Sequence, residues 1–137
     1  MASPLLVTAA IIIHNNQVLL TRNNGKPYGP EYWGFPAGIG GFSNYSDPAL
    51  AVMDEVRGDI GCDFKGHFFT QHYFEPPEKP PTITIFYVGS ILGDPRPVCK
   101  NVLEVKYFPL DQAKRMCLKY DHNHVLEELL TRYNLLV

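Results

Sequence analysis

The sequence is poor in cysteine and has no long apolar run, and each shortage excludes a class of protein. Its 137 residues include three cysteines and no C-x-x-C pair, which argues against a disulfide framework and a cysteine-based zinc site. We therefore expect a reducing compartment, the cytoplasm. The apolar run 5–13 is too short to span a membrane, and it lacks the basic start and cleavage site of a signal peptide. No membrane partner is expected.

Positive charge is also scarce. Lys and Arg number 12 against 14 Asp and Glu, so the formal net charge is -2. This excludes a broad basic surface for long nucleic acid, whereas a local cluster could still hold one phosphorylated ligand. With 45% hydrophobic and 19% charged residues, a chain of this length is typical of one globular domain. We expect residues 1–137 to form a single domain that binds a small anionic ligand.

Strand-like and helix-like segments along the chain predict an α/β fold. Runs rich in β-branched and aromatic residues indicate strands at 5–13, 17–22, 32–35, 64–74, 82–92 and 102–108. Apolar residues at helical spacing indicate helices at 48–60, 111–117 and 122–133. The first two strands should form a hairpin, and loops are expected at 23–30, at the glycine-rich 36–44 and at the proline-rich 75–81.

The clearest local signals surround the helix at 48–60. Asp47 is a good N-terminal cap, Pro48 suits the first turn, and Gly61 is a typical stop. Glu55 and Asp59 are four residues apart and therefore lie one turn from each other on the same side of the helix. A different stripe carries the apolar residues expected in the core: Val52, Val56 and Ile60.

The two carboxylates follow a glycine-rich segment, and this combination suits a cation bound with a diphosphate. Oxygen ligands bind Mg²⁺ or Mn²⁺, and a backbone without side chains lets phosphate groups come close. The metal would neutralise the diphosphate and orient an attacking water. Carboxylates at this spacing also occur on ordinary solvated helix faces, so the spacing of Glu55 and Asp59 alone leaves both interpretations open.

The stretch 33–38, followed by 48–62, resembles the Nudix box and the Pro-Gly-Gly segment that usually leads into it. Glu55 falls on the glutamate of the Arg-Glu pair of the box, Asp59 on its last glutamate, and Gly61 on its glycine. The flanking strands are similar in order and spacing to those of the family. The resemblance implies an α/β/α sandwich around a mixed β-sheet.

Three positions depart from the box: Asp54 replaces the arginine, Gly58 the first glutamate of the Glu-Glu pair, and Ser46 the early glutamate. Counting back along the box places its opening glycine at Gly40, whereas a two-residue insertion places it at Gly38. We prefer Gly38, because loops absorb insertions at low cost. Loss of the carboxylate at 58 removes ligand charge and favours weak or altered catalysis.

The resemblance implies a pyrophosphohydrolase that cleaves a diphosphate linkage in a nucleoside diphosphate derivative. It implies Mg²⁺ or Mn²⁺ held by Glu55, Asp59 and a backbone carbonyl at Gly38, with Glu55 alternatively acting as the general base. The resemblance also suggests roles for two further side chains. Glu104 is a candidate acid or base, and Arg22 is a candidate phosphate ligand.

Tyr32 is a candidate substrate-binding residue, because it could stack on a nucleobase together with Tyr28 or Trp33. Each of these side chains also has an ordinary explanation. Aromatic residues near a glycine loop often pack into the core, and Trp33 is expected to do so. A surface arginine beside a turn and an exposed glutamate on a strand would account for Arg22 and Glu104.

A rival interpretation comes from a different class: a Nudix-fold module that has lost hydrolysis and binds a nucleotide or a protein. The departures from the box favour it, whereas the lack of room for a DNA-binding appendage favours the enzyme. Relatives are often dimers, so a homodimer is a further expectation. His122 and His124 stand at a helix start that Asp121 should cap, and we expect no metal there. His67 and His72 are expected at the surface.

Overall fold

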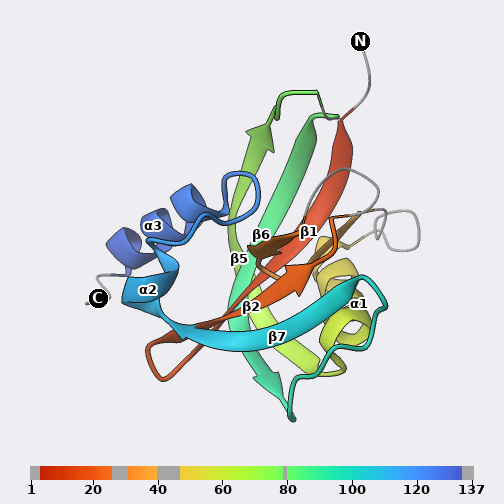
Figure 1. Ribbon diagram of the computed structural model, residues 1–137, viewed down its shortest axis with the longest axis vertical. Coiled ribbons are helices and arrows are strands. Elements are labelled where there is room, and N and C mark those ends of the chain that lie inside the picture. The colour runs from red at the N-terminus through yellow and green to blue at the C-terminus, as the bar shows by residue number, and fades with distance from the viewer. Residues whose placement is uncertain (1–3, 26–30, 40–46, 79, 134–137) are drawn as a thin grey trace.

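The fold is a mixed β-sheet with helices on both faces (Figure 1). The computed structural model describes residues 4–25, 31–39, 47–78 and 80–133. The sheet runs in the order β3-β2-β1-β6-β5, with β4 also paired to β1 and β7 to β2. The elements are β1 (Leu5–His14), β2 (Gln17–Asn23), β3 (Tyr32–Gly34), β4 (Ala37–Ile39), α1 (Pro48–Ile60), β5 (Asp63–Phe74), β6 (Thr82–Leu92), β7 (Val102–Pro109), α2 (Leu110–Ala113) and α3 (His122–Arg132).

Strand β1 lies at the centre of the sheet and gives it its mixed character. It pairs in parallel with β6 and antiparallel with β4 and β2. The turn into β2 holds Asn15 and Asn16 at φ values of 50° and 60°, in the left-handed region that asparagine tolerates. The predicted hairpin is confirmed.

Neighbouring residues of β1 point to opposite faces of the sheet and so enter two separate cores. Ala9 and Ile11 pack in the cluster that contains the apolar side chains of α3. Ala10 and Ile12 pack in the cluster that contains those of α1. All four are fully buried. The predicted α/β/α sandwich is therefore confirmed.

Local hydrogen bonds fix both ends of α1 where the sequence predicts them. The Asp47 carboxylate accepts a hydrogen bond from the backbone N–H of Ala49 at 2.9 Å. Gly61 adopts a φ of 73°, and its N–H donates to the carbonyl of Arg57 at 3.0 Å. This φ favours glycine, because a side chain would meet steric strain there.

Strand β4 differs from the expected loop. Residues 37–39 pair with Val7, Thr8 and Ala9 of β1, so the chain is extended at this point rather than looped. The glycine-rich sequence concealed a short strand because its partner lies about thirty positions earlier in the chain. Gly38 is thereby held in a regular strand beside α1.

The helix expected at 111–117 is also shorter, because α2 ends at Ala113. The side chain of Asn123 accepts a hydrogen bond from the N–H of Leu118 at 2.8 Å and donates one to the carbonyl of Met116, which holds the chain in a turn. Helix α3 follows near the expected position. Asp121 precedes it but makes no side-chain capping hydrogen bond, so its predicted role as a cap is wrong.

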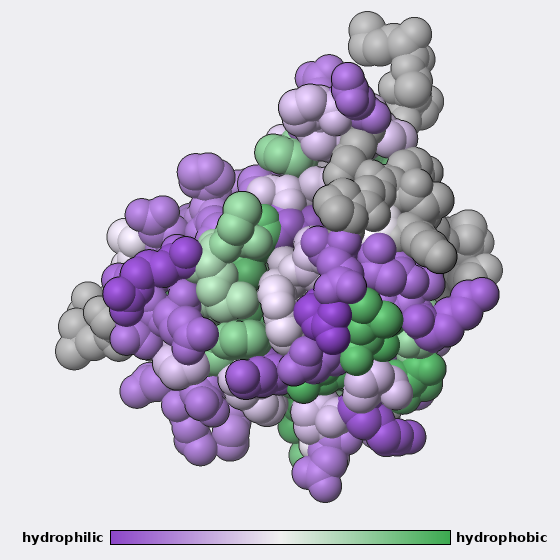
Figure 2. Space-filling model, in the orientation of Figure 1, coloured by the Kyte–Doolittle hydropathy of each residue, from purple (hydrophilic) through white to green (hydrophobic). Residues whose placement is uncertain are grey.

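The surface is largely hydrophilic in the view of Figure 2, with apolar residues in separate patches. Large exposed apolar side chains include Phe68 and Tyr73 on β5 and Leu92 at the end of β6. Among the described residues, no helix has the length and apolar character needed to cross a membrane.

Candidate active site

Helix α1 brings Glu55 and Asp59 together at one end of a cavity. Their carboxyl groups lie close enough to interact, and Asp59 is only 8% exposed. Burial, followed by the charge of Glu55, raises the pKa of the Asp59 carboxyl to about 9. Two adjacent carboxyl groups, one of them buried, disfavour full ionisation unless a positive charge joins them.

The chain that follows β6 closes over the C-terminal turn of α1. The N–H of Arg96 donates to the carbonyl of Ile60 at 3.1 Å, and the N–H of Val98 donates to the carbonyl of Asp59 at 3.0 Å. These bonds satisfy carbonyl groups that the end of a helix leaves without intrahelical partners. They also bring Cys99 beside the Asp59 carboxyl.

Gly38 provides the surface against which Glu55 rests. A Cβ atom built at this position would lie 1.5 Å from Oε1 of Glu55 and 2.0 Å from its Cδ. No side chain is compatible with that approach while the carboxylate stays in place. The glycine therefore leaves open the space that the Glu55 carboxylate occupies.

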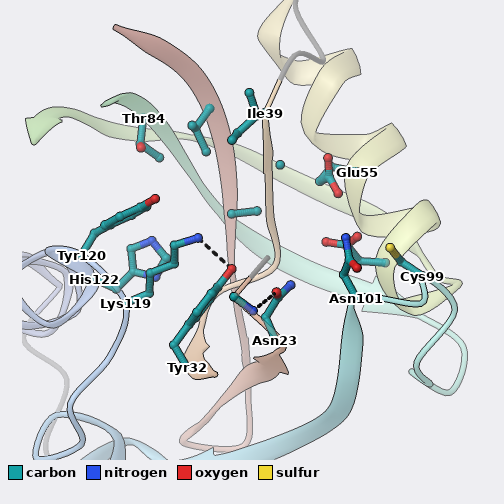
Figure 3. A pocket seen from close by; sticks show the side chains of 15 residues that line it. Asn23, Tyr32, Ile39, Glu55, Thr84, Cys99, Asn101, Lys119, Tyr120 and His122 are labelled. Carbon is teal, nitrogen blue, oxygen red and sulfur yellow. Dashed lines mark hydrogen bonds between the residues drawn. The ribbon is translucent and has the colours of Figure 1, made fainter. Parts of the chain in front are cut away.

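The cavity has a volume of about 270 Å³ and two chemically different ends. Figure 3 shows Glu55, Cys99 and Asn101 on one side and Tyr32, Lys119, Tyr120 and His122 on the other. Small and apolar residues form much of the remaining wall: Val7, Ala37, Gly38, Ile39 and Thr84. Among the described lining residues, Lys119 is the one lysine or arginine.

Lys119 is held by its backbone and by two aromatic rings. Its N–H donates to the carbonyl of Trp33 at 2.8 Å, and its Nζ donates to the hydroxyl oxygen of Tyr32 at 2.7 Å. The same Nζ lies 4.0 Å from the ring centroid of Tyr32 and 4.5 Å from that of Tyr120. Burial raises the pKa of the Tyr32 phenol, so its hydroxyl keeps its proton.

His122 forms the floor of this end and is buried. Its Nδ1 accepts a hydrogen bond from the N–H of Phe35 at 3.2 Å, and the two rings are stacked with centroids 4.6 Å apart. Burial, followed by the charge of Lys119, lowers the pKa of His122 to about 3. The ring is therefore neutral at ordinary pH, with its proton on Nε2.

The oxygen donors at the carboxylate end fit a hard divalent cation. A positive ion would relieve the repulsion between Glu55 and Asp59 and favour the ionised form of the buried carboxyl. The described residues contain no group of three or more His, Cys, Asp or Glu placed to hold a metal. Mg²⁺ commonly takes only one or two carboxylates and completes its shell with water and substrate phosphates.

The family model described as the NUDIX domain matches residues 4–130. The chain belongs to the Nudix family. Members of this family are hydrolases that act on diphosphate bonds. No sequence among curated proteins matches this Nudix protein.

Solved structures of other Nudix proteins share the fold. The MutT Nudix hydrolase from Burkholderia pseudomallei has a TM-score of 0.81 at 20% identity, covering 93% of this chain and 99% of that chain. The Nudix domain of Shewanella oneidensis NrtR, in complex with ADP ribose, has a TM-score of 0.83 at 18% identity, with 97% and 90% covered. The MutT protein from Methanosarcina mazei Go1 has a TM-score of 0.79 at 20% identity, with 99% of both chains covered.

The departures of this Nudix box from the family pattern lie on the outer part of α1 or outside the described residues. Gly58 is exposed, and a Cβ at this position would meet no atom within 4 Å. Asp54 is exposed as well. Gly40 and Ser46, like Tyr28, lie outside the described residues. Position 58 therefore has room for the carboxylate that the family pattern places there.

Arg22 and Glu104 lie opposite each other on β2 and β7 and pair with one another. The Nε of Arg22 donates to Glu104 at 3.1 Å, and its Nη1 donates to Glu31 at 2.6 Å. Neither Arg22 nor Glu104 lines the cavity as the structure describes it. The structure brings together Glu55, Asp59, Gly38 and Tyr32 and leaves these two apart from them.

Several cavity residues were not identified from the sequence, and one expectation about a histidine was wrong. Lys119 and Tyr120 belong to no recognisable motif. They lie in the segment between α2 and α3, which the fold brings to the cavity. The sequence around His122 suggests only a metal ligand or a helix start, whereas the residue lines the cavity. His72 is partly buried rather than at the surface, because its Nδ1 lies 2.8 Å from Asp121.

Proposed function

We propose that this Nudix protein hydrolyses a diphosphate linkage in a nucleoside diphosphate derivative and requires Mg²⁺ or Mn²⁺. The observation that carries the proposal is the pair of neighbouring carboxyl groups of Glu55 and Asp59, which line one end of a cavity whose other end holds a lysine. The complex of a fold relative with ADP ribose supports a ligand of this class. The carboxylates then face the diphosphate and its cation, while the rest of the substrate extends towards Lys119.

When bound, the cation would neutralise the diphosphate and lower the pKa of the attacking water. Asp59 and a backbone carbonyl of Gly38 would hold this cation, and Glu55 would either join them or act as the general base. As the base, Glu55 takes a proton from the water while the water oxygen attacks phosphorus and the anhydride P–O bond breaks, its electron pair staying on the leaving phosphate oxygen. Tyr32 donates its hydroxyl proton to the substrate, because its oxygen already accepts from Lys119.

Roles for Arg22 in phosphate binding and for Glu104 as an acid or base would require their ion pair to open. We therefore give them no place in this mechanism. A cytoplasmic location and a homodimer complete the proposal. The first is supported by three free cysteines and the second by resemblance to the family.

A binding module without hydrolysis is the second candidate, and Gly58 is the observation that favours it. The exposed glycine removes one carboxylate from the helix that should supply most of the metal ligands. Such a module would bind nucleotide with the same cavity but release no product.

The test is product release from nucleoside triphosphates, sugar nucleotides, ADP-ribose and dinucleoside polyphosphates with Mg²⁺ or Mn²⁺. Glu55→Gln should lower turnover by about 10²-fold or more, since it removes a ligand or a general base. Asp54→Asn is the matched control, because it neutralises an exposed carboxylate on the same helix and should leave turnover unchanged. Folded protein that turns over none of these compounds would favour the binding module, and equal turnover in Glu55→Gln would refute the site.

A further inference from the structure

Two buried polar side chains line the cavity on the side away from Glu55 and Cys99 (Figure 3). His122 is 2% exposed and Thr84, on β6, is 4% exposed. Nδ1 of His122 accepts from the N–H of Phe35, which leaves the Nε2–H as its second polar group. Within the described part of the chain, neither this N–H nor the hydroxyl of Thr84 has a hydrogen-bond partner. Buried polar groups are nearly always satisfied, so these two point to a ligand that completes them.

The ring of His122 is held in place before any ligand binds. It is stacked on Phe35 with centroids 4.6 Å apart, and it makes T-shaped contacts with Phe86 and Tyr120 at 5.6 Å and 6.5 Å. The hydrogen bond at Nδ1 fixes both the tautomer and the orientation of the ring. The Nε2–H therefore has a fixed direction, and little side-chain freedom is lost when it binds an acceptor.

We infer that His122 and Thr84 bind the nucleobase of the substrate. The Nε2–H of His122 donates to an acceptor atom on the edge of the base, and the hydroxyl of Thr84 bonds to another polar atom of the same edge. The inference rests on the proposed function, because it needs the diphosphate at the carboxylates so that the base reaches the opposite side. Every common base carries acceptor atoms on its edges, so His122 requires a base without choosing among them.

The chemistry of this side of the cavity suits a planar uncharged group better than a phosphate. The hydroxyl of Thr84 is neutral, and burial keeps the ring of His122 neutral as well. The ammonium group of Lys119 is bonded to Tyr32 and lies over the rings of Tyr32 and Tyr120. A flat base can lie against such rings, whereas phosphate sites usually combine several charged or backbone donors. A sugar hydroxyl is the competing ligand for the same two groups.

Thr84→Val tests the inference, because it removes the hydroxyl and keeps the branched shape of the side chain. Thr82→Val is the matched control. Thr82 lies two residues earlier on β6, and its Oγ1 is buried without a partner among the described residues, but it does not line the cavity that they form. Neither change should harm the fold, because each removes a buried hydroxyl that no described residue satisfies.

Dissociation constants are measured by calorimetry with Mg²⁺ in the Glu55→Gln protein, in which hydrolysis is suppressed. The ligands are ADP, GDP, CDP, UDP and ribose 5-diphosphate, which has the sugar and the diphosphate but no base. The nucleoside diphosphate that binds most tightly should lose about tenfold in affinity in Thr84→Val and nothing in Thr82→Val. Ribose 5-diphosphate should bind equally well to the protein with and without either change.

His122 is tested by the NMR signal of the proton on its Nε2, in protein with isotope-labelled histidine rings. The signal is assigned by its absence from His122→Gln. The same nucleoside diphosphate should shift this signal and slow the exchange of the proton with water, because the proton becomes hydrogen-bonded. Ribose 5-diphosphate should leave the signal unchanged.

A loss of affinity that ribose 5-diphosphate shares would place the contact on the sugar or the phosphates and overturn the inference. So would an unchanged affinity in Thr84→Val, an Nε2 signal that responds alike to both ligands or to neither, or the absence of binding by all four nucleoside diphosphates. Turnover by the parent protein is measured separately. A selective loss without such turnover would uphold this inference while the proposed hydrolysis failed.

Discussion

Replacing Gly38 by alanine should damage the chemistry while sparing the fold. The added Cβ would lie 1.5 Å from Oε1 of Glu55, whereas ordinary contacts begin at 3.4 Å, so the carboxylate must withdraw by about 2 Å. The obstacle is the far end of a flexible side chain, and Glu55 is not fully buried. The backbone of β4 and its pairing with β1 therefore have no reason to change.

A displacement of this size should be costly for catalysis. Misplacing a catalytic group by about 1 Å can lower the rate by about 10²-fold, which corresponds to about 2.7 kcal/mol of barrier. We expect kcat/KM of Gly38→Ala to fall by at least that factor. The free energy of unfolding should change by less than about 1 kcal/mol, because the pairing of β4 with β1 is kept and Glu55 is partly exposed.

The test measures two quantities for Gly38→Ala and for Gly58→Ala: kcat/KM on the best substrate, and the free energy of unfolding in urea. A Cβ at Gly58 meets nothing within 4 Å, so this second variant should keep kcat/KM and gain up to about 1 kcal/mol from better helix propensity. The reasoning is refuted if Gly38→Ala keeps the parent kcat/KM, or if both variants lose activity alike.

Two further predictions follow from the site. Gly58→Glu should bind Mn²⁺ more tightly and turn over substrate faster than Gly58→Gln, because only the glutamate restores a carboxylate at this open position. Equal affinities of the two variants in a Mn²⁺ titration would contradict this prediction. His122 should make stability fall as the pH drops from 6.5 to about 3, because the unfolded chain takes up the proton before the buried ring does. Urea unfolding should show that the free energy of unfolding of the parent protein falls by a few kcal/mol over this pH range, and by less in His122→Gln. If the variant loses as much stability as the parent, His122 is not the group responsible.

The sequence predicts the features whose signals are local. Asp47 and Gly61 mark the ends of α1, and the four-residue spacing of Glu55 and Asp59 places both carboxylates on one side of it. The sandwich also follows from the strand and helix pattern together with the family resemblance. These features depend on neighbouring residues, so their physical causes are visible in a short stretch of chain.

The features that escape the sequence depend on distant contacts. Strand β4 forms by pairing with β1, which lies about thirty positions earlier in the chain. Arg22 forms an ion pair with Glu104, which lies 82 positions later in the chain. Lys119 enters the cavity because its backbone bonds to Trp33. Nothing near these residues in the chain indicates such partners, because strand register and the path of a turn are settled by packing.

The hydrogen bonds from Arg96 and Val98 to the last turn of α1 tie the carboxylate end of the cavity to local unfolding of that turn. If that turn opens, both amides lose their acceptors in the same event that frees the backbone of Asp59. Their hydrogen-exchange rates therefore measure how often the site is disassembled in the resting protein. A ligand that bridges the two carboxylates should slow exchange at these two amides, although it need not touch either of them.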